Sequence, residues 1–141
     1  MLPVLLIHTP YYINFASKNK RVFYGSAAAV RQELERGSTL GVKYVVTHMG
    51  SAKEWVEDPK ATATPAKALE QAIKGLKAIY EDSSKFSARL LLEISAGAGS
   101  VVGDTFEELG HLLSGLGRDM NILVKDILAR MDLRPCSLIR T

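Results

Sequence analysis

Three short apolar runs, each followed by a side chain that can bind a metal, constrain the fold of this chain most. They are Leu2–Ile7 before His8, Val42–Thr47 before His48, and Arg89–Leu92 before Glu93. Continuous apolar runs are typical of strands that are buried on both faces of a parallel sheet. The carboxyl ends of such strands lie at one edge, where the following loops build functional sites. We therefore expect His8, His48 and Glu93 to converge.

Helical patterns separate the three runs. Apolar residues recur at three- and four-residue spacing over 19–36, where Gly37 is expected to end the helix, and again over 65–80, where Thr64 is expected to be the N-cap. Asp104 is expected to cap a short helix that reaches Leu113. The polar segment 49–64 contains Pro59, is followed by Pro65, and is predicted to be a long loop in which Trp55 is exposed. Strands and helices thus alternate, which predicts an α/β fold with parallel strands and right-handed crossovers.

The last part of the chain, 117–141, breaks this alternation. Its apolar residues are spaced as on one face of a helix, and Arg134 and Pro135 would end that helix. The residues in this stripe are Ile122, Leu123, Ile127, Leu128 and Met131. The spacing is that of a helical stripe, but the sequence leaves open whether the tail folds as a strand or as a helix.

Length and composition indicate one globular domain. The chain has 141 residues, of which 47% are hydrophobic, and its net charge of +3 comes from 18 basic and 15 acidic residues that are interspersed. This charge is only weak evidence for an anionic partner such as DNA. A single cysteine, Cys136, excludes an internal disulfide and fits a reducing compartment. The first apolar run is too short for a signal peptide or a membrane span, so we expect a cytoplasmic protein.

The three convergent side chains suggest metal chemistry. Imidazole nitrogen and carboxylate oxygen are ligands of zinc and related divalent ions, and three protein ligands with an open position can activate water. One histidine at a strand end is more often a structural residue, so the hypothesis depends on all three. The glycine-rich segment 96–103 could bind a phosphate through backbone amides, or it could simply be a tight turn between strand and helix.

Three ordered motifs carry a resemblance to a known family. They are HTPYYIN from His8, HMGS from His48, and EISAGAGSVVGDTFEEL from Glu93. In their order and spacing they resemble the motifs of the endonuclease IV family of apurinic/apyrimidinic endonucleases. The resemblance covers roughly residues 3–113.

The resemblance implies a zinc-dependent hydrolase with a (β/α)8 TIM barrel, which cleaves the DNA phosphodiester bond 5′ to an abasic site in DNA repair. It implies that His8 and His48 bind one zinc ion and that Glu93, the catalytic residue, bridges this ion to a second. It also implies DNA contacts for three further positions, Tyr11, Asn14 and Ser51. Zn²⁺ is the expected cofactor, and DNA that contains abasic sites is the expected partner.

Several features depart from the family pattern. Met49 replaces a proline, Ile94 and Ser95 replace Asn-Thr, and no later ligand motif follows residue 113. A barrel of this kind needs about 250 residues. We therefore expect a single partial barrel over 1–141, with a family-like part at 3–113 and a divergent tail at 114–141, that is truncated or completed by self-association or a partner. Two alternatives stay open: a barrel related to sugar isomerases and epimerases, and a non-catalytic half-barrel that assembles with a partner.

Overall fold

The chain folds into a parallel sheet that is covered by helices on one face. A computed structural model describes residues 4–58, 60–81, 85–95, 99–117, 122–124 and 136–140. The strands in it form a sheet in the order β4-β3-β2-β1-β5, and every pairing is parallel. Their bounds are β1 Val4–His8, β2 Tyr44–Thr47, β3 Arg89–Leu92, β4 Ile122–Val124 and β5 Cys136–Arg140. This arrangement confirms the expected partial α/β barrel with alternating strands and helices.

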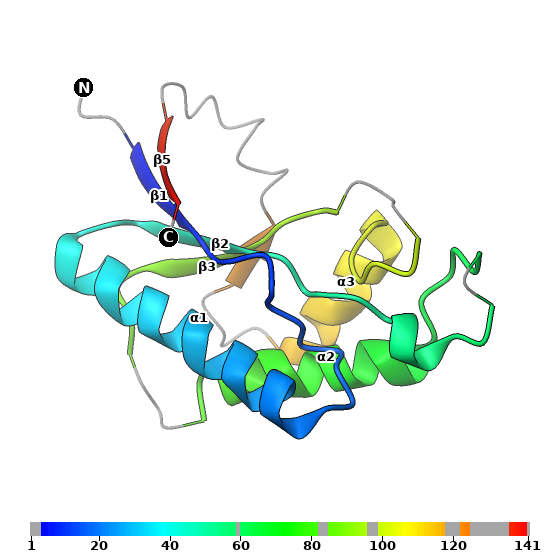
Figure 1. Cartoon of the computed structure of the whole chain (residues 1–141). Helices are drawn as coiled ribbons and strands as arrows, with labels where there is room; N and C mark the ends of the chain where they lie inside the picture. The colour runs from blue at the N-terminus through cyan, green and yellow to red at the C-terminus, as the bar shows by residue number, and fades with distance from the viewer. Residues whose placement is uncertain are drawn as a thin grey trace.

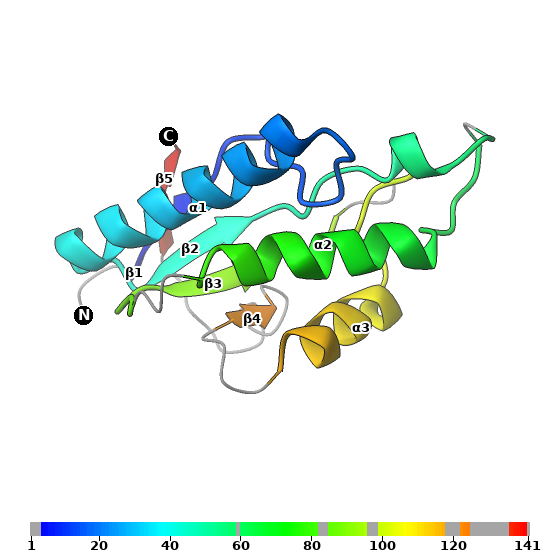
Figure 2. The ribbon, with the colours of Figure 1, turned by 90° about the horizontal axis from the view of Figure 1, so that it is seen from below.

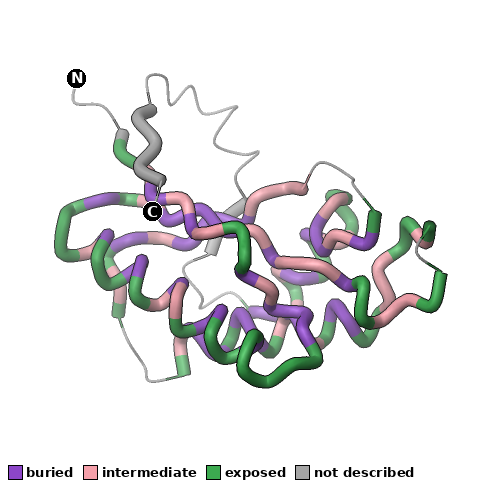
Figure 3. The backbone as a smooth tube through the Cα atoms, viewed as in Figure 1, coloured by how far each residue is buried: buried purple, intermediate pink, exposed green. Residues whose placement is uncertain are grey.

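Three helices lie side by side against one face of the sheet (Figures 1 and 2). They are α1 Lys20–Leu40, α2 Ala66–Ala78 and α3 Phe106–Leu116. Helix α2 contacts both α1 and α3. Buried and exposed turns alternate along α1 and α2 in Figure 3, as expected for helices with one apolar face.

The register of the strands divides their side chains between two faces. Ile7 pairs with Val45, and Val45 pairs with Leu90. These residues are buried in the main hydrophobic core, which they share with the helices. The residues that alternate with them, Val46 and Leu91, form a separate cluster on the other face. The strands are therefore apolar on both faces, which explains why their sequences show no alternation.

Helix α1 extends beyond its expected end. It begins after Asn19, whose side chain accepts hydrogen bonds from two backbone amides, and it ends at Gly41 with a φ of 72°. The expectation that Gly37 ends the helix is wrong. A Cβ atom at Gly37 would lie 3.4 Å from both Ala88 and Ile7, so this glycine allows the helix to pack closely on the sheet.

The starts of the other two helices also differ from the sequence-based expectation. Helix α2 begins one residue after Pro65, and Thr64 is not its N-cap, because its hydroxyl donates to the Val101 carbonyl at 3.5 Å. Helix α3 is capped by Thr105, not Asp104, because the Thr105 hydroxyl accepts the Glu108 amide at 3.2 Å. It runs to Leu116, three residues beyond the expected end.

The region between β2 and α2 is more ordered than a simple loop. It contains a 3-10 turn, η1 Lys53–Trp55. The expectation that Trp55 is exposed is wrong, because its indole N–H donates to the Ala16 carbonyl at 2.6 Å and the Lys18 ammonium lies 4.5 Å above its ring. This turn therefore attaches the loop after β2 to the loop after β1.

The tail, for which the sequence leaves both strand and helix open, contains two strands. Ile122–Val124 forms β4, which pairs with β3, and Cys136–Arg140 forms β5, which pairs with β1. A short apolar run fits a strand as well as a helix, and the edge of β3 presents backbone N–H and C=O groups with which a further strand can pair. The remaining residues of the expected helical stripe, Ile127, Leu128 and Met131, lie outside the described residues.

The sequence also predicts that no segment spans a membrane. Among the helices that the structure describes, none is long and apolar enough to cross a bilayer.

Candidate metal centre

His8, His48 and Glu93 converge at the carboxyl ends of β1, β2 and β3. His8 is the last residue of β1, and the other two residues directly follow β2 and β3. Glu93 Oε2 lies 2.6 Å from His8 Nε2 and 3.5 Å from His48 Nε2. One ligand atom from each residue lies within 4.8 Å of the others. The three side chains are 11%, 23% and 17% exposed, so they are partly shielded but accessible from solvent.

The tautomer of His8 can be inferred from its contacts. His8 Nδ1 lies 2.8 Å from the Thr9 carbonyl oxygen, which can only accept a hydrogen bond, so Nδ1 carries a hydrogen. Nε2 then faces the Glu93 carboxylate, and two lone pairs at 2.6 Å require a proton or a cation between them. An imidazole whose other nitrogen is fixed by a carbonyl is a common arrangement for a metal ligand. The donor set therefore fits a divalent metal ion.

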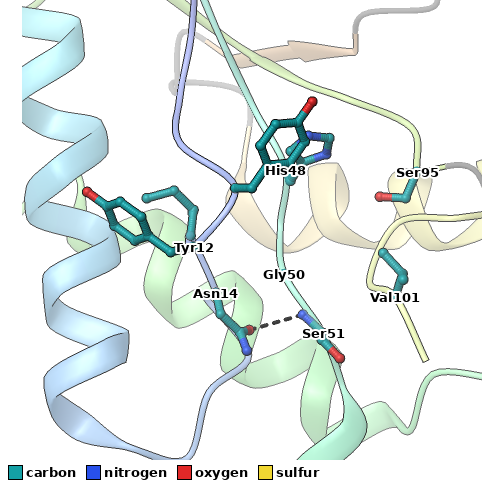
Figure 4. A pocket seen from close by; sticks show the side chains of 9 residues that line it. Tyr12, Asn14, His48, Gly50, Ser51, Ser95 and Val101 are labelled. Carbon is teal, nitrogen blue, oxygen red and sulfur yellow. Dashed lines mark hydrogen bonds between the residues drawn. The ribbon is translucent and has the colours of Figure 1, made fainter. Parts of the chain in front are cut away.

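A pocket of about 320 Å³ opens beside this cluster. It lies between the loops that follow β1, β2 and β3, and Figure 4 shows its labelled lining around His48. All three residues for which DNA contacts were predicted line it: Tyr11, Asn14 and Ser51. These DNA contacts stay predictions.

The three predicted DNA-contacting residues differ in their local roles. Tyr11 is 74% exposed, and its ring stacks on His48 with centroids 5.2 Å apart. Asn14 Oδ1 accepts the backbone amides of Ala16 at 3.0 Å and Ser51 at 3.2 Å, and the latter bond is drawn in Figure 4. Tyr11 is thus a surface that a ligand can contact, whereas the Asn14 oxygen holds two loops together.

Backbone hydrogen bonds join the loops into one layer. Phe15 donates to the Met49 carbonyl at 2.9 Å, and Val102 donates to the Gly50 carbonyl at 3.0 Å. Met49 itself is fully buried, and a Cβ atom at Gly103 would lie 2.1 Å from its terminal methyl group. Met49 therefore fills the space beneath the glycine-containing loop, and the loop after β2 connects the other two.

The glycine-rich segment lies only partly within the described residues. Residues 96–98 of this segment lie outside them, so its phosphate binding stays a prediction. Ser100 is buried, and its hydroxyl donates to the Ala61 carbonyl at 3.4 Å. Farther along, burial and the neighbouring Glu108 raise the pKa of Asp104.

Sequence reasoning missed three residues at this end of the sheet. Thr9 and Thr47 are buried hydroxyl residues adjacent to the two histidines, and Tyr12 is a 68% exposed residue that lines the pocket, with its ring directed away from His48 in Figure 4. The sequence does place a threonine next to each histidine, in His8-Thr9 and Thr47-His48. A buried hydroxyl group at the end of an apolar strand needs a hydrogen-bond partner, so these dipeptides could have indicated the two threonines.

Comparison with known proteins identifies similar sequences. A family model described as xylose isomerase-like TIM barrel matches residues 2–126. A probable endonuclease 4 of Carboxydothermus hydrogenoformans is 30% identical over 115 residues, which are 82% of this chain and 37% of that protein. A probable endonuclease 4 of Methanoculleus marisnigri is 32% identical over 109 residues, covering 77% of this chain and 36% of that protein. The chain thus spans less than two fifths of the length of these relatives.

Solved structures show the same fold. Endonuclease IV from Thermus thermophilus is 31% identical, with a TM-score of 0.59 over 84% of this chain and 37% of that one. An L-ribulose 3-epimerase has a TM-score of 0.67 but is only 20% identical, over 87% of this chain and 40% of that one, and so indicates the fold alone. These findings confirm the resemblance to endonuclease IV that the sequence motifs predict.

Proposed function

The chain belongs to the xylose isomerase-like TIM barrel family, and on this basis we propose that it is a zinc-binding segment of an endonuclease IV-type hydrolase. Its proposed substrate is DNA that contains an abasic site, and the bond cleaved is the phosphodiester bond 5′ to that site. The relatives of about 30% identity are named as endonucleases, which supports hydrolysis of nucleic acid as the reaction class.

The convergence of His8, His48 and Glu93 carries this proposal. These residues are distant in sequence, yet their ligand atoms lie within 4.8 Å of one another at the edge where barrel enzymes hold their sites. Zinc bound here would act as a Lewis acid toward a phosphate oxygen and would lower the pKa of a water molecule. Two neutral imidazoles and one carboxylate would leave a net positive charge on the site, which favours an anionic substrate.

The chain's own residues would orient such a substrate. Glu93 is the proposed catalytic residue and would hold the zinc ion together with both histidines, because its Oε2 atom faces them. Tyr11 shields one face of His48 and presents an exposed aromatic ring beside the pocket, on which a sugar or base can pack. Asn14 and Ser51 support the pocket wall from which the predicted DNA contacts would be made.

Metal binding and DNA cleavage test this proposal in the same samples. We expect about one zinc ion per chain in the wild-type protein and loss of that zinc in His48→Ala. His111→Ala is the matched control, because His111 is exposed on α3 and should leave zinc binding unchanged. Cleavage of a duplex with one abasic site, absent in His48→Ala, would support the full proposal. Equal zinc content in all three proteins would contradict the site.

The same assays distinguish the alternatives. Epimerisation of a ketose without cleavage of abasic DNA would replace the proposed reaction with that of the sugar-epimerase branch. Zinc binding without either activity would favour a half-barrel that acts only with a partner or a second copy, which sedimentation measurements would detect. We propose the reducing cytoplasm as the compartment, since the chain has a single cysteine.

A further inference from the structure

Two buried threonines lie directly behind the candidate metal centre. Thr9 directly follows β1 and Thr47 is the last residue of β2; they are 2% and 0% exposed and lie one residue beyond the pairing of His8 with Val46. Their hydroxyl oxygens are 2.9 Å apart. Since side chains alternate along the chain here, the two threonines share the helix-facing side with Ile7 and Val45, whereas His8, one residue before Thr9, lies on the opposite side in the candidate metal centre.

The direction of the hydrogen bonds follows from their partners. Thr47 Oγ1 lies 3.0 Å from the His48 carbonyl oxygen, which can only accept, so the Thr47 hydroxyl donates to it. Thr9 must then donate its hydroxyl hydrogen to Thr47 Oγ1. The two hydroxyl hydrogens therefore form a short chain that leads from β1 through β2 to the backbone of His48.

The backbones of the same two threonines contact the other two ligands. The Thr9 carbonyl accepts the hydrogen of His8 Nδ1 at 2.8 Å. The Thr47 carbonyl accepts the Glu93 amide at 3.0 Å. Hence each of the three candidate ligands accepts or donates a hydrogen bond with Thr9 or Thr47. The hydrogen bond between the two hydroxyl groups links these two threonines to each other.

We propose that Thr9 and Thr47, the threonine pair, are positioning residues that fix the separation and orientation of His8, His48 and Glu93 for metal binding. This inference rests on the proposed function, because it assumes a metal at that site. Partners of metal ligands commonly change metal affinity by about 10- to 100-fold when they are removed. The threonine pair would act in this way through the backbone of the strands.

Valine and serine substitutions separate positioning from simple stability. Thr47→Val keeps the shape but removes the hydroxyl, and we expect Zn²⁺ affinity, measured by calorimetric titration, to fall by about 10-fold or more. Thr47→Ser keeps the hydroxyl and should stay within about threefold of the wild type. Thr39→Val is the control, since Thr39 is an exposed residue of α1 whose hydroxyl also donates to a backbone carbonyl.

The double variant Thr9→Val with Thr47→Val provides the decisive comparison. Replacing both partners of a hydrogen bond with apolar groups of the same shape is nearly neutral for stability, so its unfolding midpoint should return toward the wild type. Its Zn²⁺ affinity should remain low, and the visible absorption spectrum of bound Co²⁺ should differ from that of the wild type.

Wild-type affinity and an unchanged Co²⁺ spectrum in the double variant would overturn the role of the threonine pair while leaving the metal site intact. Absence of zinc binding by the wild-type chain would instead overturn the metal site together with the pair. These two failures are therefore distinguishable in one set of titrations.

Discussion

The two faces of the central strands use the same backbone for different tasks. On the helix-facing side, Val45, Leu90 and Leu92 are fully buried in the main core. On the opposite side, the residues one position away form a small apolar cluster and end in His8, His48 and Glu93. Because side chains alternate along a strand, adjacent residues here can differ completely in what their replacement would change. Stability should depend mainly on the first face and metal binding on the second.

The strongest test of this comparison is Leu92→Ala. Leu92 is fully buried on the helix-facing side and directly precedes Glu93. Removing its side chain should lower the free energy of unfolding by about 2–5 kcal/mol, as measured by urea denaturation. Leu40→Ala, at a position that is 70% exposed, is the control and should change it much less. A small effect at Leu92 would show that the core tolerates loss of this contact.

Gly50→Ala tests the layer of loops in which the two faces meet. Gly50 has a φ of 104°, and a Cβ atom there would lie 2.3 Å from Asn14 Oδ1. The strain and the displaced Asn14 should cost about 1–3 kcal/mol of unfolding free energy. Gly110→Ala has open space around it within α3 and should be neutral or stabilising. Equal behaviour of the two variants would contradict the tight contact.

Glu93→Gln sharpens the contrast with its neighbour Leu92. Glutamine keeps the size of the side chain and an acceptor oxygen, so the unfolding free energy should change by less than about 1 kcal/mol. Zn²⁺ affinity should fall at least about tenfold, because an amide is a poor ligand for zinc. A loss of stability as large as that of Leu92→Ala would mean that the two faces are not separable.

Asp104→Asn should have the smallest effect, and it should be stabilising. Burial and the charge of Glu108 raise the pKa of Asp104, so the ionised form is disfavoured in the folded state. The protonated carboxyl group stabilises the folded state at low pH. This contribution is lost as the pH rises above the pKa of Asp104 in the unfolded state and through its raised pKa in the folded state. Asparagine should therefore raise the unfolding midpoint by roughly 1–2 °C at pH 7, and this gain should disappear near pH 3. A gain that persists in acid would point to a cause other than ionisation.

The sequence predicts the part of the fold that repeats a simple pattern. The three apolar runs and the helices between them are found, with ends that differ from the expected ones by at most four residues. The convergence of His8, His48 and Glu93 is likewise predicted, since parallel strands end at one edge. The predicted end of a helix is wrong where two glycines could each terminate it, as with Gly37 and Gly41. Only the packing decides which of the two glycines adopts a positive φ.

The rest depends on contacts between segments that are distant in the chain. Ile122–Val124 is too short for its periodicity to distinguish a strand from a helix. The bond between Thr9 and Thr47 depends on the register of β1 against β2, which no local pattern specifies. Likewise, the hydrogen bond from the Ser51 amide to Asn14 Oδ1 can be recognised only once the two loops are placed together.

The place of β5 beside β1 has a consequence for the kinetics of folding. β1 lies between β2 and β5 in the sheet, and Figure 1 shows the two segments from opposite ends of the colour scale side by side. During synthesis on the ribosome, β1 emerges before the other described strands, and its second neighbour, β5, emerges after them. One hydrogen-bonding edge of β1 therefore stays open to other chains until then, and closing so long a loop is slow. Folding of this sheet should be slowed by the pairing of β5 with β1, and chaperones that shield strand edges should increase its yield.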